Sequence, residues 1–313
     1  MIEKKHMRVV FMGTPEFALP TLAGLIDSGV RIVGVFTQPD RPKGRGRKLE
    51  ASPVKQLALE QGLAVFQPQR LREQDAIRQV RELRPELIVV VAYGQILPQK
   101  VLDIPKFGCI NVHASLLPRH RGAAPINRAL IEGDPIAGVT TMQMDAGLDT
   151  GAMLVKKSLA VSPNEDAGQL HDRLAELGCE ALEETLARLC AGTLNPEKQE
   201  DRCSTYAPML KKEDGLVDWS RPAAAIHNQV RGLYPWPGAF TYLDGEVLKI
   251  ADTRIAPDSG EPGQILSIDK HGVGVACGEG SVQIRKLQLP GKKMLPAADF
   301  VRGAKLQPGS KLG

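Results

Sequence analysis

Leu87-Ile-Val-Val-Val-Ala92 is an uninterrupted run of apolar, mostly β-branched residues. A strand with no polar residue on either face has both faces buried, which is typical of a parallel sheet covered by helices on both sides. Similar short runs occur before and after it, bounded by polar segments. We therefore expect successive strands over residues 9–12, 31–37, 64–67, 87–92 and 109–113.

Helical patterns alternate with these runs. Apolar residues recur at helical spacing over residues 16–27, 53–61, 73–83 and 166–189. Strands that alternate with helices are typical of βαβ units, in which the strands pair in parallel. The sequence thus predicts an α/β domain over residues 1–190, with a doubly wound, mostly parallel, Rossmann-like sheet.

The pattern changes after Ala191-Gly-Thr-Leu-Asn-Pro196, which ends the last helix and begins a polar linker over residues 191–206. The remainder, 207–313, has one helical segment at 222–233 and then short strand patterns. Two of these flank Asp244-Gly245-Glu246, a hairpin signal. Strands at this spacing predict a small, closed antiparallel barrel of the oligonucleotide-binding (OB-fold-like) kind as an all-β C-terminal domain.

Composition excludes several classes of protein. The chain has 313 residues, enough for about two domains. Only 4% of its residues are aromatic, so any contact with nucleic acid would rest on phosphates and shape more than on base stacking. The 40 Lys and Arg against 36 Asp and Glu give a net charge of +4, which excludes a histone-like polycation. Its longest apolar run is far below the ~20 residues of a membrane span. Five scattered cysteines predict a reducing, cytoplasmic location; we also expect a monomer.

Several catalytic motifs are incomplete. Gly13 follows the first strand alone where dinucleotide binding needs G-x-G-x-x-G, and a phosphate-binding G-x-x-x-x-G-K-[ST] is missing from the sequence. Asp149-Thr150-Gly151 matches the tripeptide of aspartic proteases, but that chemistry needs a second copy. Cys109 falls inside a predicted buried strand, a poor place for a reactive thiolate.

A denser set of polar residues follows the strand at 109–113. Because side chains alternate along a strand, Asn111 and His113 are expected on one face at its carboxyl end, where doubly wound sheets bind ligands. The carboxylates of Asp145 and Asp149 come at the end of the next strand. An amide, an imidazole and carboxylates at one sheet edge favour a catalytic site over structural hydrogen bonding.

These residues form a pattern that is similar to the signature of a known enzyme family. The pattern Asn111-x-His113-x-Ser115-Leu-Leu-Pro118-x-x-Arg121-Gly, followed by Gly147-Leu-Asp149-Thr-Gly151, resembles the signature of folate-dependent formyltransferases. The similarity spans both predicted domains and includes the segments 37–48, 91–98 and 234–237. It implies transfer of the formyl group of 10-formyltetrahydrofolate to the α-amino group of methionine esterified to initiator tRNA, and hence a role in translation initiation.

The resemblance makes Asn111, His113 and Asp149 the catalytic trio. Attack of an amine on a formamide builds a tetrahedral oxyanion, for which Asn111 and a protonated His113 are suitable donors. Asp149 would stabilise the imidazolium and relay the amine proton. This chemistry requires no metal. The folate contacts implied by the family are Gln95, Ile96, Leu97, Ser115, Leu116, Leu117 and Pro118, with Gln95 standing where an apolar residue is expected.

A basic segment follows the second strand. It contains Arg41, Lys43, Arg45, Arg47 and Lys48 among glycines. A charge run alone is usually a solvated loop, but beside an active site that admits a tRNA end it favours tRNA binding. By resemblance, Arg45 is the selective contact with the acceptor stem. The C-terminal domain adds 14 Lys and Arg against 11 Asp and Glu; its candidate phosphate contacts are Lys211, Lys212, Arg231, Lys286, Lys292 and Lys293.

Two other functions compete with this prediction. One is formyl transfer to a small amine, such as glycinamide ribonucleotide or an amino sugar nucleotide, which needs neither the basic segment nor the barrel. The other is an RNA-binding protein without catalysis, which would not need the amide, imidazole and carboxylate together.

Overall fold

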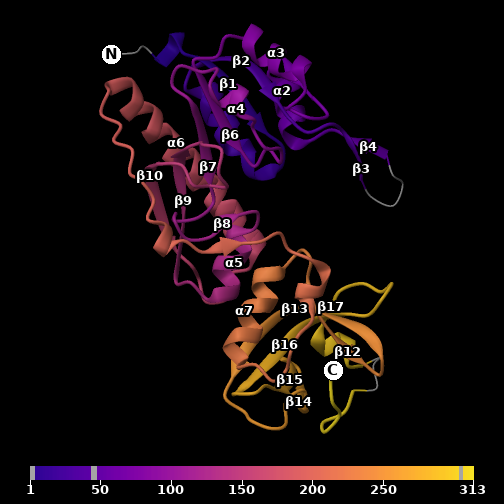
Figure 1. The fold of residues 1–313 in the computed structure, drawn as a ribbon. Helices are drawn as coiled ribbons and strands as arrows, with labels where there is room; N and C mark the ends of the chain where they lie inside the picture. Colours follow the sequence, from indigo (N-terminus) through magenta and orange to yellow (C-terminus); the bar gives the residue numbers. More distant parts are fainter. Residues whose placement is uncertain (1–3, 44–47, 303–305) are drawn as a thin grey trace. The chain divides into compact units, whose positions relative to one another are not determined.

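A seven-stranded sheet forms the centre of the N-terminal part of the chain (Figure 1). The computed structural model describes residues 4–43, 48–302 and 306–313. The hydrogen-bonded order of the strands is β10-β9-β7-β6-β1-β2-β5. Their bounds are β1 Arg8–Gly13, β2 Arg31–Phe36, β5 Val65–Phe66, β6 Leu87–Val91, β7 Cys109–His113, β9 Ile136–Gln143 and β10 Met153–Ala160.

Strand directions confirm the prediction of a doubly wound, mostly parallel sheet. The five strands from β5 to β7 pair in parallel, while β9 pairs antiparallel to β7. All five residues of β6 are buried, as expected for a strand at the centre of a covered sheet. The carboxyl ends of β1, β6 and β7 therefore lie at one edge.

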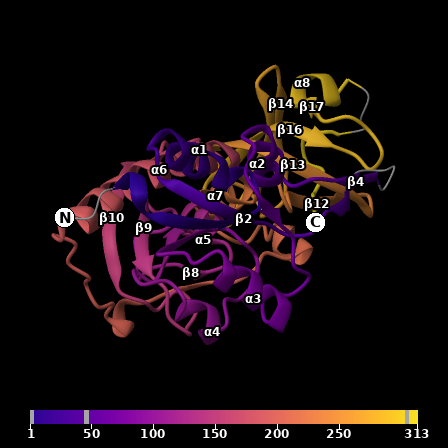
Figure 2. The same ribbon diagram turned by 90° about the horizontal axis from the view of Figure 1, so that it is seen from above.

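Helices cover both faces of this sheet, as Figure 2 shows from above. On one face, apolar residues of α3 and α4 share a core cluster with Val10, Ile88 and Cys109. On the other face, α6 packs near Val112, and α1 lies against α6. The helices of this part are α1 Leu19–Asp27, α2 Pro53–Glu60, α3 Gln74–Glu82, α4 Gln99–Leu102 and α6 Ala167–Ala191, with the 3-10 turns η1 Lys4–His6 and η2 Glu16–Ala18.

The basic segment forms a two-stranded hairpin that extends away from the sheet (Figure 1). Its strands are β3 Arg41–Lys43 and β4 Lys48–Glu50, and Lys43 pairs with Lys48. Two of the predicted tRNA contacts, Arg45 and Arg47, lie outside the described residues.

The chain divides into two compact units, each described here by itself. The first comprises Met1–Gly122, Gly138–Leu159 and His171–Tyr206, and the second comprises Ala123–Ala137, Ala160–Leu170 and Ala207–Gly313. Between α6 and the C-terminal part lie η3 Asp201–Cys203 and β11 Tyr206–Ala207, which pairs with β8 Arg121–Gly122. The functional division at residues 190 and 207 stays a prediction.

The second unit contains a six-stranded antiparallel sheet, which confirms the predicted β-rich C-terminal part. Among the described strands the hydrogen-bonded order is β12-β13-β16-β15-β14, with β17 beside β16. The two end strands of this order, β12 and β14, do not pair with each other, so the predicted barrel is not closed by hydrogen bonds between them. The bounds are β12 Ala239–Leu243, β13 Glu246–Ala256, β14 Ile265–Asp269, β15 Gly272–Ala276, β16 Ser281–Gln288 and β17 Leu295–Pro296, with helical segments α5 Pro125–Glu132, η4 Lys212–Gly215, α7 Ala223–Leu233 and α8 Ala297–Phe300.

One apolar core holds the second unit together. It includes Val217 and Trp219, three residues of α7, and the inward residues of the sheet. The indole N–H of Trp219 is buried and donates to Thr241 Oγ1 at 3.0 Å, so this large side chain has its polar atom satisfied. Within the described part of the chain, no helix combines the length and the apolar character needed to cross a membrane.

Candidate active site

Asn111 and His113 lie on one face at the carboxyl end of β7, as the strand periodicity predicts. They pair across the ladder with Met142 and Thr140 of β9, two positions apart. The side chain of Asn111 is half-buried, and its amide makes no hydrogen bond within the described residues. A half-buried amide of this kind is available to a ligand.

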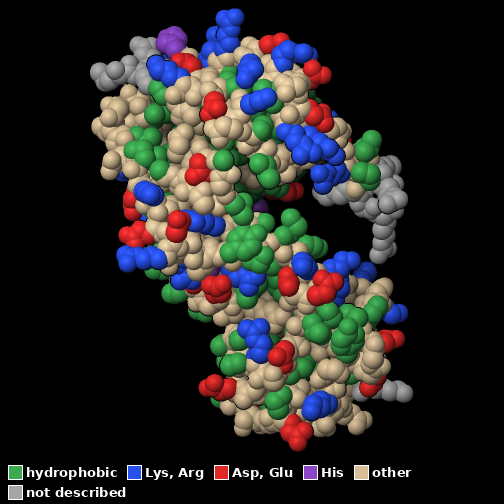
Figure 3. Space-filling view, viewed as in Figure 1, with side chains coloured by type: hydrophobic (Ala, Val, Ile, Leu, Met, Phe, Trp, Pro, Cys, Tyr) green, Lys and Arg blue, Asp and Glu red, His purple; other side chains and the backbone are tan. Residues whose placement is uncertain are grey.

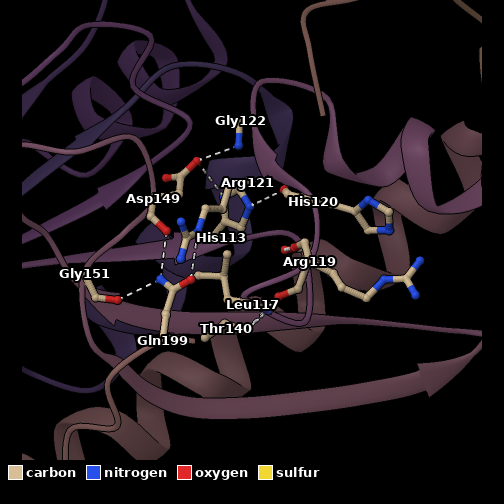
Figure 4. A network of polar contacts seen from close by, with 11 residues as sticks. His113, Leu117, Arg119, His120, Arg121, Gly122, Thr140, Asp149, Gly151 and Gln199 are labelled. Carbon is tan, nitrogen blue, oxygen red and sulfur yellow. Dashed lines mark hydrogen bonds and ion pairs between the residues drawn. The ribbon is translucent and has the colours of Figure 1, made fainter. Parts of the chain in front are cut away.

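The imidazole of His113 is held between a carbonyl and a carboxylate (Figure 4). Its Nε2 lies 2.9 Å from the backbone oxygen of His120, and because a carbonyl only accepts, Nε2–H is the donor. Its Nδ1 lies 3.7 Å from Asp149 Oδ2, beyond hydrogen-bond distance but within the range of an ion pair. The ring is buried, so its position is closely fixed.

Asp149 lies in a loop that fixes its backbone. Its φ of 54° is in the left-handed region, which Asp tolerates better than most residues. Its Oδ2 accepts the N–H of Gly122 at 2.9 Å. Asp145 Oδ1 closes the loop from inside by accepting from Gly147 N at 3.0 Å and Thr150 Oγ1 at 2.7 Å. The sequence predicts two carboxylates at this strand end, and the structure gives them different roles. Asp149 faces His113, whereas Asp145 holds the shape of the loop.

A close backbone approach requires glycine at position 151. A Cβ on Gly151 would lie 1.7 Å from the carbonyl oxygen of Gln143. Real Cβ atoms do not approach oxygen so closely, so any other residue would push the Asp149 loop away from the end of β9.

The segment 115–118, predicted to contact folate, forms a rigid turn. The Oγ of Ser115 donates to Arg119 O at 2.6 Å. Thr140 Oγ1 donates to Ser115 O at 2.7 Å and accepts from Leu117 N at 3.1 Å. Leu117 is buried, while Leu116 and Pro118 are partly exposed. The turn therefore offers a fixed apolar surface next to β7.

The residues of the other predicted folate segment, 95–97, differ in what they contact. Gln95 accepts from Leu71 N at 2.6 Å and donates to Pro68 O at 3.1 Å, so its amide holds a neighbouring loop. Leu97 is buried in the core. Ile96 has 88% of its surface exposed and is the apolar side chain of this segment that a ligand could cover. Direct folate contact by all seven residues stays a prediction.

The base of the basic hairpin is fixed by a polar cluster that sequence reasoning missed. Asp40 Oδ2 accepts from Lys55 Nζ at 2.6 Å and its Oδ1 accepts from Gln67 Nε2 at 2.7 Å. The hydrogen bonds from Lys55 and then Gln67 hold the pKa of Asp40 below its ordinary value. Arg41, the first predicted tRNA contact, is exposed and donates to Gln38 Oε1 at 3.1 Å.

Lys and Arg side chains gather on the surface beside the base of this hairpin (Figure 3). In contrast, one predicted basic contact of the second unit is unavailable. Arg231 is only 8% exposed. Its guanidinium donates to the carbonyl oxygens of Ser162 at 3.3 Å and Glu165 at 3.2 Å, so it anchors a loop onto α7. The amphipathic pattern of α7 gave no sign that this position faces inward.

Cys109 is excluded as a nucleophile, as the sequence predicts. It is 1% exposed in β7. Burial raises the pKa of its thiol to about 12, and the charge of Asp103 adds to this effect, so a thiolate does not form near neutral pH.

Comparison with known proteins agrees with this geometry. Residues 7–186 match the family described as formyl transferase, and residues 209–305 match the formyl transferase C-terminal domain. The chain belongs to the formyl transferase family. The N-terminal match contains Asn111, His113 and Asp149 together with the loops that hold them.

Relatives and solved structures extend the comparison. Methionyl-tRNA formyltransferases of Geobacter sulfurreducens and Citrifermentans bemidjiense are 58% and 59% identical over 307 residues, covering 98% of this chain and 97% and 96% of those proteins. The sugar 3N-formyl transferase WlaRD is similar in fold, with a TM-score of 0.68 at 17% identity, covering 92% of this chain and 99% of that one. HypX from Aquifex aeolicus in complex with tetrahydrofolic acid has a TM-score of 0.65 at 17% identity, covering 97% of this chain and 51% of that one.

Proposed function

We propose that this chain transfers the formyl group of 10-formyltetrahydrofolate to the α-amino group of methionine esterified to initiator tRNA. The observation that carries the proposal is the amide of Asn111, which has no hydrogen-bond partner among the described residues and lies on the same face of β7 as His113, the partner of Asp149. The names of the relatives at 58% and 59% identity support the acceptor. The tetrahydrofolic acid and 5-N-formyl-THF named for two structures of the same fold support the donor class.

The reaction begins when the neutral amine attacks the formyl carbon. The carbonyl oxygen then becomes an oxyanion, which a fixed N–H donor stabilises. Asn111 Nδ2 has no competing partner within the described residues, so it can take this role without first breaking a hydrogen bond. Removing one such donor in other enzymes costs about 10² to 10³ in kcat.

Collapse of the oxyanion then breaks the bond between the formyl carbon and the folate nitrogen, and this nitrogen takes up a proton as tetrahydrofolate leaves. The amine loses one proton in the same reaction, so a nearby group has to accept that proton and pass it on. Oδ2 of Asp149 accepts from Gly122, whereas Oδ1 has no hydrogen-bond partner among the residues that the structure describes and can take this proton. A protonated His113 would keep Nε2–H on the His120 carbonyl and place Nδ1–H toward Asp149. A shift of about 1 Å would turn their 3.7 Å separation into a hydrogen bond. With both ring nitrogens directed at protein oxygens, we propose Asn111 as the primary oxyanion donor, and direct donation by His113 stays a prediction.

The acceptor is the part of the proposal that the fold alone does not decide. WlaRD and the N-formyltransferase from Helicobacter canadensis, whose structure contains dTDP-3-aminofucose, have the same fold. The basic hairpin favours a nucleic-acid acceptor, since phosphates bind Lys and Arg whatever the base sequence. We further propose that the second unit contacts tRNA through exposed cations such as Lys211 and Lys212, and that the chain acts in the cytoplasm as a monomer.

Formyl transfer measured with three acceptors tests the proposal. The purified chain is given 10-formyltetrahydrofolate and either methionyl initiator tRNA, free methionine or a dTDP-amino sugar. We expect product from methionyl initiator tRNA alone. Product from the amino sugar and not from the aminoacyl-tRNA would contradict the proposed acceptor.

A further inference from the structure

Gln199 is a buried polar residue to which the family comparison gives no role. It lies between the two matched regions, 7–186 and 209–305, and only 5% of its surface is exposed. Two residues earlier, Glu197 exchanges backbone hydrogen bonds of 2.8 Å in both directions with Met153 of β10. The backbone that carries Gln199 is therefore fixed to the sheet of the first unit.

The amide of Gln199 bridges the loop of Asp149 and the side chain of Arg121. Its Nε2 donates to Asp149 O and to Gly151 O, both at 2.8 Å. Its Oε1 accepts from Arg121 Nε at 3.0 Å. The opposite orientation of the amide would place oxygen against two carbonyl oxygens and nitrogen against a guanidinium, so the observed one is the only orientation with satisfied partners.

These hydrogen bonds act where the backbone is strained. Asp149 has a φ of 54°, and the two accepting carbonyls lie on either side of Thr150. A residue in the left-handed region persists when its surroundings determine its conformation. Gln199 ties this part of the loop to β10 from one side, while the N–H of Gly122 holds the carboxylate of Asp149 from the other.

The short segment 120–122 links the hydrogen bonds of Gln199 to the rest of the site (Figure 4). His120 O accepts from His113, Arg121 binds Gln199, and Gly122 N binds Asp149. The position of the Asp149 carboxylate relative to the imidazole therefore depends on the bridge that Gln199 makes between the Asp149 loop and Arg121.

We propose that Gln199 is a positioning residue for the reaction, which holds the loop of Asp149 so that its carboxylate stays directed toward His113 and available to the proton of the amine. The inference rests on the proposed function and adds to it a residue outside the motif described in the sequence analysis. It acts through Asp149 and does not touch the substrate.

The first test compares Gln199→Leu with the unmodified chain in formyl transfer to methionyl initiator tRNA. Leucine fills the space but donates nothing to the two carbonyls. We expect kcat to fall by about 10-fold to 10²-fold, as displacements of about 1 Å at a catalytic group do, while KM for the folate stays within about 2-fold. Asp201→Asn is the matched control, because Asp201 binds Arg121 from an exposed position; its rate should stay within about 2-fold.

A double-mutant cycle separates positioning from a general structural role. If Gln199 acts through Asp149, then Gln199→Leu added to Asp149→Asn should lower kcat by less than about 2-fold further. Full additivity of the two losses would contradict the proposal, because it would show that Gln199 acts independently of Asp149.

Gln199→Glu keeps the test decisive if the leucine variant does not fold. The carboxylate retains the pairing with Arg121 but has no N–H for the carbonyls of Asp149 and Gly151. We expect kcat to fall as far as in Gln199→Leu, and a rate equal to that of the unmodified chain would overturn the inference. If the unmodified chain itself transfers no formyl group, the proposed function is contradicted instead.

Discussion

Two polar clusters near the carboxyl edge of the parallel sheet differ in how completely their groups are satisfied. In the cluster at the base of the hairpin, Asp40 uses both oxygens, at 2.6 Å from Lys55 Nζ and 2.7 Å from Gln67 Nε2. In the cluster at the end of β7, Asn111 has no partner within the described residues, and His113 stands 3.7 Å from Asp149.

The difference indicates the task of each cluster. A satisfied cluster has no group left for a ligand and stabilises the segment that it joins. A half-buried donor without a partner in the described part of the chain contributes no hydrogen bond to the fold there and can bind a ligand without first breaking one. We therefore assign the Asp40 cluster to holding the basic hairpin and the Asn111 site to chemistry.

The largest expected effect comes from removing the unpartnered donor. We expect Asn111→Ala to lower kcat by about 10² or more while affinity for the folate changes little, as loss of an oxyanion donor does. The melting temperature should stay close to that of the unmodified chain, because the amide has no partner in the described structure to lose. Steady-state kinetics and a thermal melt on the same sample check both expectations.

A second asparagine gives the matched control. Asn127 Nδ2 donates to Gly232 O at 2.7 Å, within the second unit. Asn127→Ala should lower the free energy of unfolding by about 1 kcal/mol, the net worth of one hydrogen bond, and leave kcat within about 2-fold. If Asn111→Ala and Asn127→Ala lowered kcat equally, the claim that the Asn111 amide has a special role in the reaction would be contradicted.

An intermediate effect is expected at the base of the hairpin. Asp40→Asn keeps the shape of the side chain but loses the charge that Lys55 binds. The hairpin should be less firmly oriented, so KM for methionyl initiator tRNA should rise by roughly 3-fold to 10-fold, about the worth of one charged hydrogen bond.

Exposed carboxylates provide the comparison for that variant. Asp75 forms an ion pair with Arg78 on the surface of α3, with both side chains well exposed. Asp75→Asn should leave every kinetic constant unchanged, because exposed pairs contribute little. A similar rise in KM for both variants would mean that general charge, and not the hairpin anchor, had been measured.

The smallest effect concerns a satisfied cluster in the second unit. His227 Nε2–H donates to Pro163 O and Nδ1 accepts from Thr253, both at 3.0 Å. Burial lowers the pKa of His227 below its ordinary 6.5. Between those two pKa values the unfolded chain binds more protons than the folded one, so stability falls as the pH drops below about 6.5 and is unaffected above it.

Thermal melts over a pH series check this expectation. The melting temperature of the unmodified chain should fall more between about pH 7.5 and about pH 5.5 than that of His227→Gln, which has no group to titrate. Parallel curves for the two proteins would show that His227 is not kept neutral by burial.

Much of the first unit could be predicted because its signals are local. The apolar run of β6 and the helical spacing of α1, α2, α3 and α6 correspond to the expected ranges within a few residues. The edge strand β10 was not predicted, because Lys156 and Lys157 interrupt its apolar pattern. An edge strand needs only part of its length buried, so its sequence carries a weaker signal.

The parts of the site that lie within one short motif could be predicted from the sequence. Contacts between residues far apart in the sequence could not. The face shared by Asn111 and His113 follows from strand periodicity. Gln199 reaches Asp149 across 50 positions of sequence, and Gln67 reaches Asp40 across 27. Such contacts depend on how strands and loops are placed in space, which no local pattern contains.

The most direct test of the central claim, that the Asn111 amide donates to the oxyanion, is the rate of Asn111→Asp compared with Asn111→Ala under single-turnover conditions with methionyl initiator tRNA. Aspartate has nearly the same shape as asparagine but presents a negative charge where the oxyanion forms. The account predicts that Asn111→Asp is slower than Asn111→Ala, although it preserves the volume of the side chain. A rate for Asn111→Asp near that of the unmodified chain would contradict it.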